Sequence, residues 1–407
     1  MGKFLIRGGN SLCGSVCVSG SKNAALPVIF ASLSLFGRSE IVGLPDIGDV
    51  RVALELVKEQ GALITRRGDT TLIDATNLSY VTPDSTLVAR LRASTYLIGA
   101  CLARYGRIEL GSYGGCSFSY RPIDYHLSLA AQMGAKREGD TITAPRLKPA
   151  TARLPRASVG ATVNFLILAA STEGESRLYS PATEPHIDTL IDFLRSAGAV
   201  IEREENSITV RGGGLTGGRV HIGGDPIEAG TYICAALATG GSLRILGADP
   251  QELSPLLSLI ADGGATVDTT LGISVSGCIG APLSVVARPH PGFPTDLQPI
   301  VAPLMATSHG GRILDTVWRD RYGYLGELAR LGVSYVIDDR GALVCPSCLT
   351  GGSANATDLR GGAACVIAAL AADGYSEVGS ASTVLRGYSH LTEKLRSIGA
   401  DVEYSPL

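Results

Sequence analysis

Long runs of like charge are missing from this sequence of 407 residues. Its 35 basic and 38 acidic residues nearly balance, and charges of one sign never occur five or six in succession. Such runs are typical of proteins that bind nucleic acids or membrane surfaces through a broad electrostatic field. We therefore expect no nucleic-acid partner and no membrane partner, and any bound anion must be held by a few well-placed side chains.

A long hydrophobic run and a secretory leader are missing as well. The apolar run Val163 to Ala170 is far shorter than the roughly 20 residues that cross a bilayer, and the N-terminal residues lack the pattern of a signal peptide. Nine cysteines, an odd number at low density, do not indicate a disulfide framework. We expect a cytoplasmic protein with reduced thiols, and 45% hydrophobic residues suffice for two or three domains.

A helix-like segment, a Gly-Ala or Gly-Val pair and a strand-like segment recur in this order six times. The first glycines of the pairs are Gly61, Gly134, Gly198, Gly264, Gly332 and Gly399. Glycine commonly ends a helix because it adopts the left-handed conformation without steric cost. Each unit also begins with an Ala- and Gly-rich helix that is too uniformly apolar for the surface. We predict six repeats of about 65 to 70 residues, each with a buried helix packed by strands, in two lobes of three.

Charged side chains stand at the openings of these apolar helices. The opening residues are Lys22 with Asn23, Arg92, Ser158, Glu228, Asp296 and Arg360. An acidic residue there can simply complement the helix dipole, whereas a cation lies at the unfavourable end. An anionic ligand held between the cations and the helix N-termini would turn this penalty into a binding site. We expect this site to bind phosphate or carboxylate groups.

Seven short motifs along nearly the whole chain carry a resemblance to a known family. They are GSKNAALP (20–27), RAS (92–94), GGC with RPID (114–124), SVGAT (158–162), GFPTDLQ (292–298), DLR (358–360) and RGY (386–388). With them the sequence resembles the enolpyruvyl transferases, and it is most similar to those that act on UDP-N-acetylglucosamine. The resemblance implies an α/β fold, a two-lobed inside-out α/β barrel of six βαβ-type units. It places residues 20–230 in one lobe, residues 1–19 with 231–407 in the other, and the active site between them.

The resemblance also implies a reaction. The enolpyruvyl group of phosphoenolpyruvate passes to the 3-hydroxyl of UDP-N-acetylglucosamine, and phosphate is released, for peptidoglycan synthesis. The hydroxyl attacks C2 of the donor while C3 gains a proton, and the tetrahedral ketal then loses phosphate. One base near the hydroxyl and one acid near C3 are required. By resemblance these are Asp296 and Cys116, Lys22 is also catalytic, and no metal or organic cofactor is implied.

Cys116 stands in the stretch GSYGGCSFSYRPID, residues 111–124. Gly114 and Gly115 predict a loop that can close over the donor, and Arg121 would favour the thiolate form of Cys116. A loop cysteine without a role is the alternative interpretation. The matching cysteine of the family is the target of the epoxide antibiotic fosfomycin, so the resemblance implies susceptibility to it.

The remaining site residues are also implied by the resemblance. Lys22, Arg121 and Arg386 match residues that bind the donor, and Arg92 and Arg360 would add to the same positive field. Residues that match the acceptor side, or belong to motifs around it, are Asn23, Pro122, Ile123, Asp124, the segment 156–160 with Ser158, Val159 and Gly160, Val317 and Arg321.

Departures from the family pattern leave the identity of the acceptor open. They occur at Tyr113, at 117–119, at Arg319 and Asp320, and at 383–385. One interpretation is a cell-wall enzyme that uses UDP-N-acetylglucosamine. Another is a paralogue that transfers enolpyruvyl to a different uridine nucleotide, such as UMP in nucleoside-antibiotic biosynthesis. A catalytically inactive, ligand-sensing homologue is disfavoured because the expected donor and catalytic residues are present together.

Overall fold

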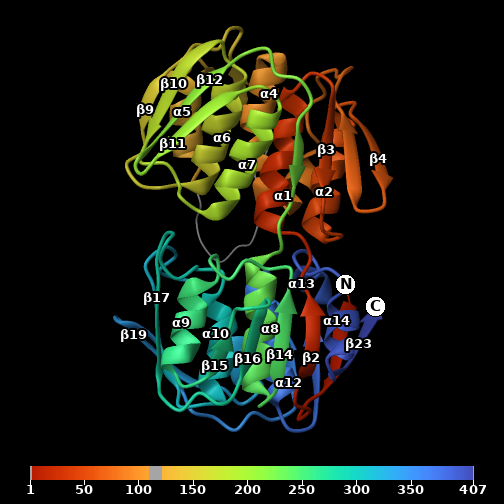
Figure 1. The fold of residues 1–407 in the computed structure, drawn as a ribbon, viewed down its shortest axis with the longest axis vertical. Helices are drawn as coiled ribbons and strands as arrows, with labels where there is room; N and C mark the ends of the chain where they lie inside the picture. The colour runs from red at the N-terminus through yellow and green to blue at the C-terminus, as the bar shows by residue number, and fades with distance from the viewer. Residues whose placement is uncertain (1, 110–121, 407) are drawn as a thin grey trace.

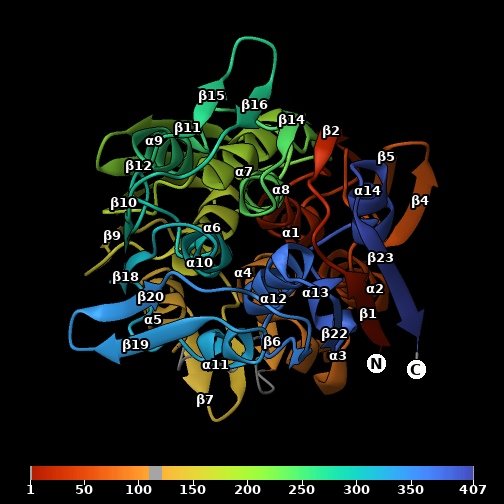
Figure 2. The ribbon, with the colours of Figure 1, turned by 90° about the horizontal axis from the view of Figure 1, so that it is seen from below.

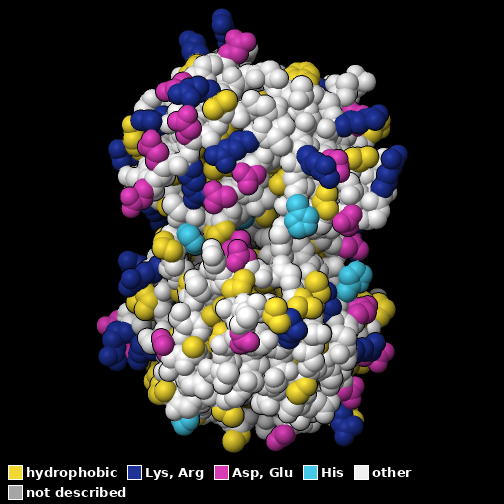
Figure 3. All heavy atoms as spheres, viewed as in Figure 1, with side chains coloured by type: hydrophobic (Ala, Val, Ile, Leu, Met, Phe, Trp, Pro, Cys, Tyr) yellow, Lys and Arg dark blue, Asp and Glu magenta, His cyan; other side chains and the backbone are white. Residues whose placement is uncertain are grey.

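Two lobes joined by two chain crossings make up the protein in a computed structural model (Figure 1). The residues that the structure describes are 2–109 and 122–406. Cys116 and Arg121 therefore lie outside the described residues. The space-filling view shows a waist where the lobes meet (Figure 3). None of the helices in the described ranges is long and apolar enough to cross a membrane.

In the described part of the first lobe, three sheets and their helices form the structure. The strands are β3 (Arg38–Val42), β4 (Leu63–Arg67), β5 (Thr70–Asp74), β6 (Arg107–Glu109), β7 (Lys136–Glu138), β8 (Thr141–Thr143), β9 (Thr151–Arg153), β10 (Gly174–Tyr179), β11 (Val200–Glu204), β12 (Ser207–Gly212) and β13 (Arg219–His221). The helices are α1 (Lys22–Ala31), α2 (Gly48–Glu59), α3 (Ser85–Arg90), α4 (Leu97–Tyr105), α5 (Asp124–Gln132), α6 (Val159–Ala170) and α7 (Pro185–Ser196), with 3₁₀ turns η1 (Ser32–Ser34) and η2 (Arg92–Tyr96).

Three further sheets form the second lobe. The strands are β1 (Gly2–Arg7), β2 (Cys13–Cys17), β14 (Ser242–Leu246), β15 (Thr266–Asp268), β16 (Ile273–Ser276), β17 (Leu283–Ala287), β18 (Gly311–Asp315), β19 (Ser334–Asp338), β20 (Gly341–Cys345), β21 (Ser353–Asn355), β22 (Tyr375–Gly379) and β23 (Asp401–Pro406). The helices are α8 (Pro226–Ala238), α9 (Ser254–Asp262), α10 (Gln298–Ala306), α11 (Tyr324–Ala329), α12 (Leu359–Ala371), α13 (Ala381–Val384) and α14 (Leu391–Ser397).

Each unit builds its sheet in the same way. The strand after the buried helix pairs antiparallel with one strand of a hairpin, as β3 does with β5 and β10 with β12. In five sheets of the described chain a short parallel strand covers the other edge. The sixth unit uses the N-terminal strand, because β1 lies between β22 and β23 and pairs Phe4 with both Val378 and Tyr404. The two ends of the chain therefore close one repeat.

The six glycines that were expected to end helices all have positive φ. The angles are 93° at Gly61, 98° at Gly134, 112° at Gly198, 107° at Gly264, 95° at Gly332 and 102° at Gly399. A residue with a Cβ atom is strained at such positive φ angles, whereas glycine is not. Glycine at these positions therefore lets the chain leave the outer helix and enter the hairpin. The predicted repeat is thus present in the backbone.

The apolar helices lie inside and the sheets outside, as expected. In the first lobe α1 and α6 are almost wholly buried and α4 is buried from Leu97 to Leu102. In the second lobe α8, α10 and α12 pack against one another. Figure 2 shows these three helices nearly end-on, surrounded by the strands of their lobe. A helix that is apolar on every side loses contact with water only when it is enclosed, which explains the arrangement.

Two separate hydrophobic cores indicate where the lobes divide. One core takes its residues from Ala24 to Ile222, and the other takes them from Phe4 to Val18 and from Ile227 to Val402. The boundary expected near residue 230 therefore falls inside α8, whose first turn already packs in the second core. A boundary at Gly224 fits the cores better, and the residue bounds of the two lobes stay a proposal.

The two crossings between the lobes lie side by side. Ser21 donates its backbone N–H to Gly223 over 2.7 Å, and Asp225 donates to Ser19 over 2.8 Å. A Cβ atom on Gly20 would lie 2.0 Å from the carbonyl oxygen of Gly43, so this segment passes too close to its neighbour for any side chain. One crossing connects β2 to α1 and the other connects β13 to α8. The two crossings therefore form a short, tightly packed antiparallel pair.

Candidate active site

Lys22 and Arg386 come from opposite lobes and share one carboxylate. Arg386 Nε donates to Asp49 Oδ1 over 2.7 Å, and Lys22 Nζ lies 3.4 Å from Asp49 Oδ2. The Asp49 side chain is only 5% exposed and stands in the first turn of α2. Backbone bonds reinforce the contact, because Gly48 N donates to Leu385 O and Asp49 N to Arg386 O. Two of the cations expected to bind the donor are thus held together.

A second carboxylate joins the N-termini of α1 and α8. Asp225 caps α8 by accepting from the backbone N–H groups of Ile227 and Glu228, and its other oxygen accepts from Lys22 N over 3.1 Å. The side chain of Ser21 caps α1 by accepting from Ala24 N. Helix N-termini carry partial positive charge, so one buried carboxylate stabilises both of them. This places Lys22 at the junction of the lobes.

Asp296 lies between two buried arginines of the second lobe. Arg321 Nη1 donates to Asp296 Oδ1 over 2.8 Å, and Arg360 Nε lies 3.9 Å from Asp296 Oδ2. Burial acts to raise the pKa of Asp296, but the charges of Arg321, Arg360 and Lys22 outweigh it and hold the pKa well below its usual range. The carboxylate is therefore ionised near pH 7, and with 31% of its side chain exposed it is also accessible.

Arg360 presents unused hydrogen-bond donors. Its side chain is 2% exposed, and Nη1 and Nη2 have no hydrogen-bond partner among residues 2–109 and 122–406. Its Cζ lies 5.2 Å from the ring centroid of Tyr388, whose hydroxyl bonds Thr231 over 2.8 Å. Asp358 caps α12 by accepting from the N–H groups of Arg360 and Gly361. A buried cation with free donors is suited to an anionic group.

The expected acceptor-side residues of the first lobe lie around α5 and α6, which pack together. Ser158 caps α6 by accepting from Ala161 N over 3.4 Å, and Val159 and Gly160 form the first turn. Arg156 Cζ lies 5.9 Å from the ring centroid of Tyr125, and this contact connects the 156–160 segment to α5.

The other residues expected in this lobe stand at the starts of α5, η2 and α1. Pro122 and Asp124 are exposed and Ile123 is half-buried, at the start of α5. Arg92 is half-buried and opens the 3₁₀ turn before α4, where its charge acts on His126 of α5. Asn23 is half-buried in the first turn of α1.

Val317 belongs to a loop that is tied to the Asp296 segment. Asp315 Oδ1 accepts from Val317 N over 2.9 Å and from Trp318 N over 2.8 Å. Its other oxygen accepts from the hydroxyl of Thr295, the residue before Asp296. Cys116 and Arg121 were expected at the same junction and lie outside the described residues, so their roles stay predictions.

Sequence reasoning missed two carboxylates and misjudged a third. Asp49 and Asp225 were not expected to bind the lobes together, because an acidic residue at the N-cap or in the first turn of a helix normally indicates only capping or dipole complementation. Glu228 was given that same role. Its buried carboxylate instead accepts from Ser19 N over 2.8 Å and from Lys394 Nζ over 2.6 Å. A lysine 166 residues away could not be recognised as its partner from one sequence.

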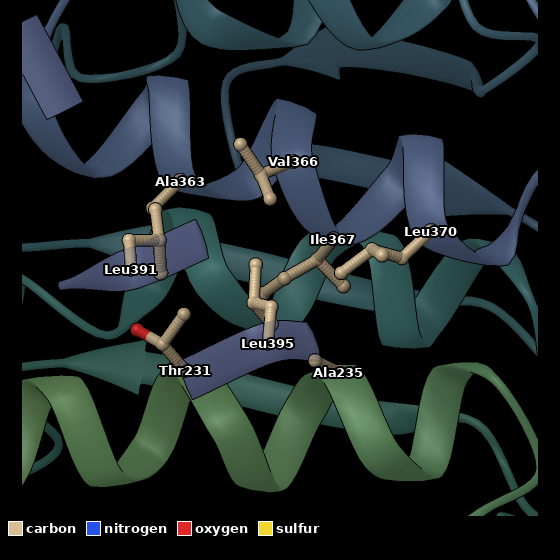
Figure 4. Close-up of a pocket in the computed structure, with 8 residues that line it drawn as sticks. All are labelled: Thr231, Ala235, Ala363, Val366, Ile367, Leu370, Leu391 and Leu395. Atoms are coloured by element: carbon tan, nitrogen blue, oxygen red, sulfur yellow. The ribbon is translucent and has the colours of Figure 1, made fainter. Parts of the chain in front are cut away.

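An internal gap elsewhere in the second lobe does not compete with this junction as a substrate site. It measures about 10 Å³ and lies between α8, α12 and α14, where aliphatic side chains and the methyl of Thr231 surround it (Figure 4). Such a volume admits about one water molecule. Among the described residues no cluster of His, Cys, Asp and Glu could hold a metal ion.

Six βαβ-type units in two lobes, with cations of both lobes at the junction, define the enolpyruvyl transferase class. The family model for EPSP synthase (3-phosphoshikimate 1-carboxyvinyltransferase) matches residues 6–395, so the chain belongs to this family of 1-carboxyvinyl transferases. The expected fold class, family and reaction type are thereby confirmed.

Individual relatives define the similarity further. UDP-N-acetylglucosamine 1-carboxyvinyltransferase of Halothermothrix orenii is 38% identical and aligns over 99% of each chain. A protein named UDP-N-acetylglucosamine 1-carboxyvinyltransferase 3 from Caldanaerobacter subterraneus is 37% identical over 99% of each chain. Among solved structures, the enolpyruvyl transferase NikO from Streptomyces tendae has a TM-score of 0.88 with 28% identity over 99% of each chain. EPSP synthase from Acinetobacter baumannii, at 20% identity and a TM-score of 0.72 over the whole of both chains, shows the fold alone.

Proposed function

We propose that this protein transfers the enolpyruvyl group of phosphoenolpyruvate to the 3-hydroxyl of UDP-N-acetylglucosamine and releases phosphate. The product would serve peptidoglycan precursor synthesis in the cytoplasm. The observation that carries the proposal is the junction itself, where Lys22 and Arg386 of opposite lobes share Asp49 and the charge of Lys22 also acts on Asp296. The identity of 35–38% to relatives with this activity in their names favours this acceptor.

The donor would bind with its two anionic groups against the cations. Lys22 and Arg386, which share Asp49, would form the centre of this field, and Arg92 and Arg360 would extend it from the two lobes. Arginine matches the planar carboxylate and the phosphate with paired donors, which supports this distribution. Arg121 belongs to this set by resemblance only.

Asp296 would accept the proton of the acceptor hydroxyl. In the unliganded protein three cations make Asp296 a weak base. When the donor brings negative charge to Lys22 and Arg360, those cations are partly neutralised, and the pKa of Asp296 rises toward the working pH. Donor binding would therefore prepare the base, so the hydroxyl attacks C2 only when phosphoenolpyruvate is in place.

The remaining steps follow from the chemistry. As the hydroxyl oxygen bonds to C2, C3 takes a proton from an acid, which resemblance assigns to Cys116. The resulting ketal then loses a proton from C3 while the bond from C2 to the phosphate oxygen breaks. Phosphate leaves, and the double bond between C2 and C3 is restored in the product.

The acceptor nucleotide would lie along the first lobe and reach Asp296 across the junction. Ser158, Val159 and Gly160 offer the N-terminus of α6 to a phosphate group. The start of α5, from Pro122 to Asp124, would face the uridine. Asn23, Val317 and Arg321 would contact the sugar or position Asp296.

Transfer to another uridine nucleotide, such as UMP, is the second candidate. Arg319 and Asp320, which depart from the family pattern, are exposed beside Val317, where the sugar of the acceptor would lie. An enzyme with a different acceptor would be expected to carry a different sequence in this loop. This candidate stands second because the relatives at 35–38% identity are named for UDP-N-acetylglucosamine.

A phosphate-release assay distinguishes the candidates. Purified protein is mixed with phosphoenolpyruvate and, separately, with UDP-N-acetylglucosamine, UMP, uridine or shikimate 3-phosphate. We expect release with UDP-N-acetylglucosamine. Release with UMP alone would contradict this acceptor, and no release with any of the four would contradict the enzyme proposal.

A further inference from the structure

His126 lies under the first turn of α6 in a place that only glycine leaves open. The side chain belongs to α5 and is 5% exposed. A Cβ atom on Gly160 would stand 2.6 Å from His126 Cε1 and 2.8 Å from Nε2, but 3.8 Å from Nδ1. The Nε2 edge of the ring therefore faces the start of α6, and Nδ1 faces away from it.

A buried asparagine fixes which ring nitrogen carries the proton. Gly99 N–H donates to Asn164 Oδ1 over 2.6 Å, so the amide nitrogen of Asn164 is the atom that faces His126 Nδ1 at 2.7 Å. The same nitrogen also faces the carbonyl oxygens of Thr95 and Gly160. An amide NH₂ can only donate, so Nδ1 of His126 accepts and the proton is on Nε2.

The ring stays neutral near pH 7. Burial lowers the pKa of His126, the charge of Arg92 lowers it further, Asp124 opposes them, and the result is about 4. Among the described residues, Arg92 in η2 and Asp124 at the start of α5 are the charged groups that act on the ring. His126 is therefore a neutral N–H donor, and its ring makes one hydrogen bond in the described part of the chain, through Nδ1.

Other donors point to the same place. The backbone N–H groups of Val159 and Gly160 are in the first turn of α6, where no intrahelical acceptor exists. Arg92 adds positive charge from the neighbouring turn. The His126 side chain is more than nine-tenths buried, and its Nε2 has no hydrogen-bond partner among the described residues. A phosphate oxygen at the helix N-terminus would accept from it without requiring a charged histidine.

We propose that His126 Nε2–H donates to a phosphate oxygen of the nucleotide acceptor at the N-terminus of α6. His126 is thereby a residue that selects phosphorylated over unphosphorylated uridine compounds. This inference rests on the proposed function, because it takes the acceptor to be a uridine nucleotide. Asn164 and Gly160 are the positioning residues, the first by fixing the tautomer and the second by leaving room for the ring.

The test measures binding of UDP and of uridine to the full-length protein by calorimetry. In His126→Gln the amide nitrogen can reach the position of Nε2 and keep a donor there. In His126→Asn the shorter side chain reaches only the position of Nδ1. We expect His126→Asn to bind UDP about tenfold or more weakly than wild type, His126→Gln to stay within about threefold, and uridine affinity to be unchanged in both. His309→Asn, at an exposed turn, serves as the matched control.

Three other results would contradict the inference, and one of them would also contradict the proposed function. Equal UDP binding by wild type and His126→Asn would overturn the inference alone. Equal loss of UDP binding in both His126 variants, or a parallel loss of uridine binding, would overturn it in favour of a packing role. A wild-type protein that does not bind UDP would overturn the proposed acceptor class together with this inference. Circular dichroism of each variant shows whether it is folded, and if His126→Asn is not, Gly160→Ala, which displaces the ring, is measured in its place.

Discussion

Arg386 of the second lobe donates its Nε hydrogen to the buried carboxylate of Asp49 in the first lobe, over 2.7 Å. The two residues are 337 positions apart in the chain. Because the other oxygen of Asp49 lies 3.4 Å from Lys22 Nζ, the relative position of the two cations proposed to bind the donor depends on contact between the lobes. The proposed anion site therefore requires residues of both lobes in contact.

Replacement of Asp49 by Asn should therefore impair the reaction. The amide keeps the shape of the carboxylate but leaves two cations without their shared counter-charge, and breaking a buried ion pair costs about 3 to 5 kcal/mol. We expect kcat/KM for phosphoenolpyruvate to fall by roughly 10- to 100-fold, as measured by phosphate release. Asp46→Asn is the matched control, because Asp46 pairs with Arg51 in an exposed position and should change the rate less than about twofold. Equal effects of the two variants would contradict the role of Asp49.

Asp296→Asn should remove the proposed base. General base catalysis contributes about 100- to 10,000-fold, so we expect kcat to fall by that amount while phosphoenolpyruvate still binds. The rate is measured with saturating substrates, and donor binding is measured separately by calorimetry. Asp338→Asn breaks a partly exposed Asp–Arg pair of the same lobe, with Arg312 at 2.7 Å, and should leave kcat within about twofold. An Asp296→Asn protein with wild-type kcat would exclude Asp296 as the base.

The stability of the protein should depend on pH through His126. Its pKa is lowered to about 4 in the folded state, against the ordinary value of 6.5, so the unfolded chain binds the proton more readily between these values. The contribution of neutral His126 is complete above about pH 6.5, is lost as the pH falls toward 4, and amounts to roughly 3 kcal/mol. We expect the urea midpoint of His126→Gln to vary less with pH over this interval than that of wild type. Parallel curves for the two proteins would contradict the assignment.

The buried pair of Glu228 and Lys394 should be sensitive to loss of one partner. Lys394 Nζ lies 2.6 Å from both Glu228 Oε1 and Ser19 Oγ, beside a crossing between the lobes. Glu228→Gln or Lys394→Met alone should each destabilise the fold by about 3 to 5 kcal/mol, because an uncompensated charge stays buried. The double variant should lose clearly less than the sum of the single losses. Additive losses in urea unfolding would indicate that the two groups do not depend on each other.

A helix-ending glycine offers a test of the repeat. Gly399 has φ of 102°, and the atom nearest to a Cβ added at this position would be Ser11 O at 3.6 Å, so Gly399→Ala meets backbone strain without a clash. We expect a loss of about 1 to 2 kcal/mol of stability. Gly326→Ala, in helix α11 with open space around it, should be neutral or stabilising by about 0.4 to 1 kcal/mol. In thermal unfolding we expect the midpoint temperature to fall for Gly399→Ala and to stay the same or rise for Gly326→Ala. Equal midpoints for the two variants would contradict the role of Gly399.

Much of the fold could be predicted because its signals are local. A helix that is apolar on every side must be enclosed, and a glycine at each helix end allows positive φ, so six repeats with buried helices follow from neighbouring residues. The residue at which the second lobe begins was harder to predict from the sequence. Crossing, cap and helix follow each other without a break from Gly223 to Ala238, so the boundary expected near residue 230 fell inside α8.

In the candidate site, too, local features could be predicted and contacts between distant residues could not. The repeat, its helix-ending glycines and the charged openings of the buried helices follow from the sequence alone, since each depends on residues within one or two turns. The folded arrangement was needed to show that Asp49 joins Lys22 to Arg386, that Glu228 binds Lys394, and that Asn164 sets the proton of His126. An acidic residue in a first helical turn looks the same whether it complements a dipole or binds a cation from the other lobe. The difference is made by partners far away in the chain, which come within hydrogen-bond distance only when the lobes are folded against each other.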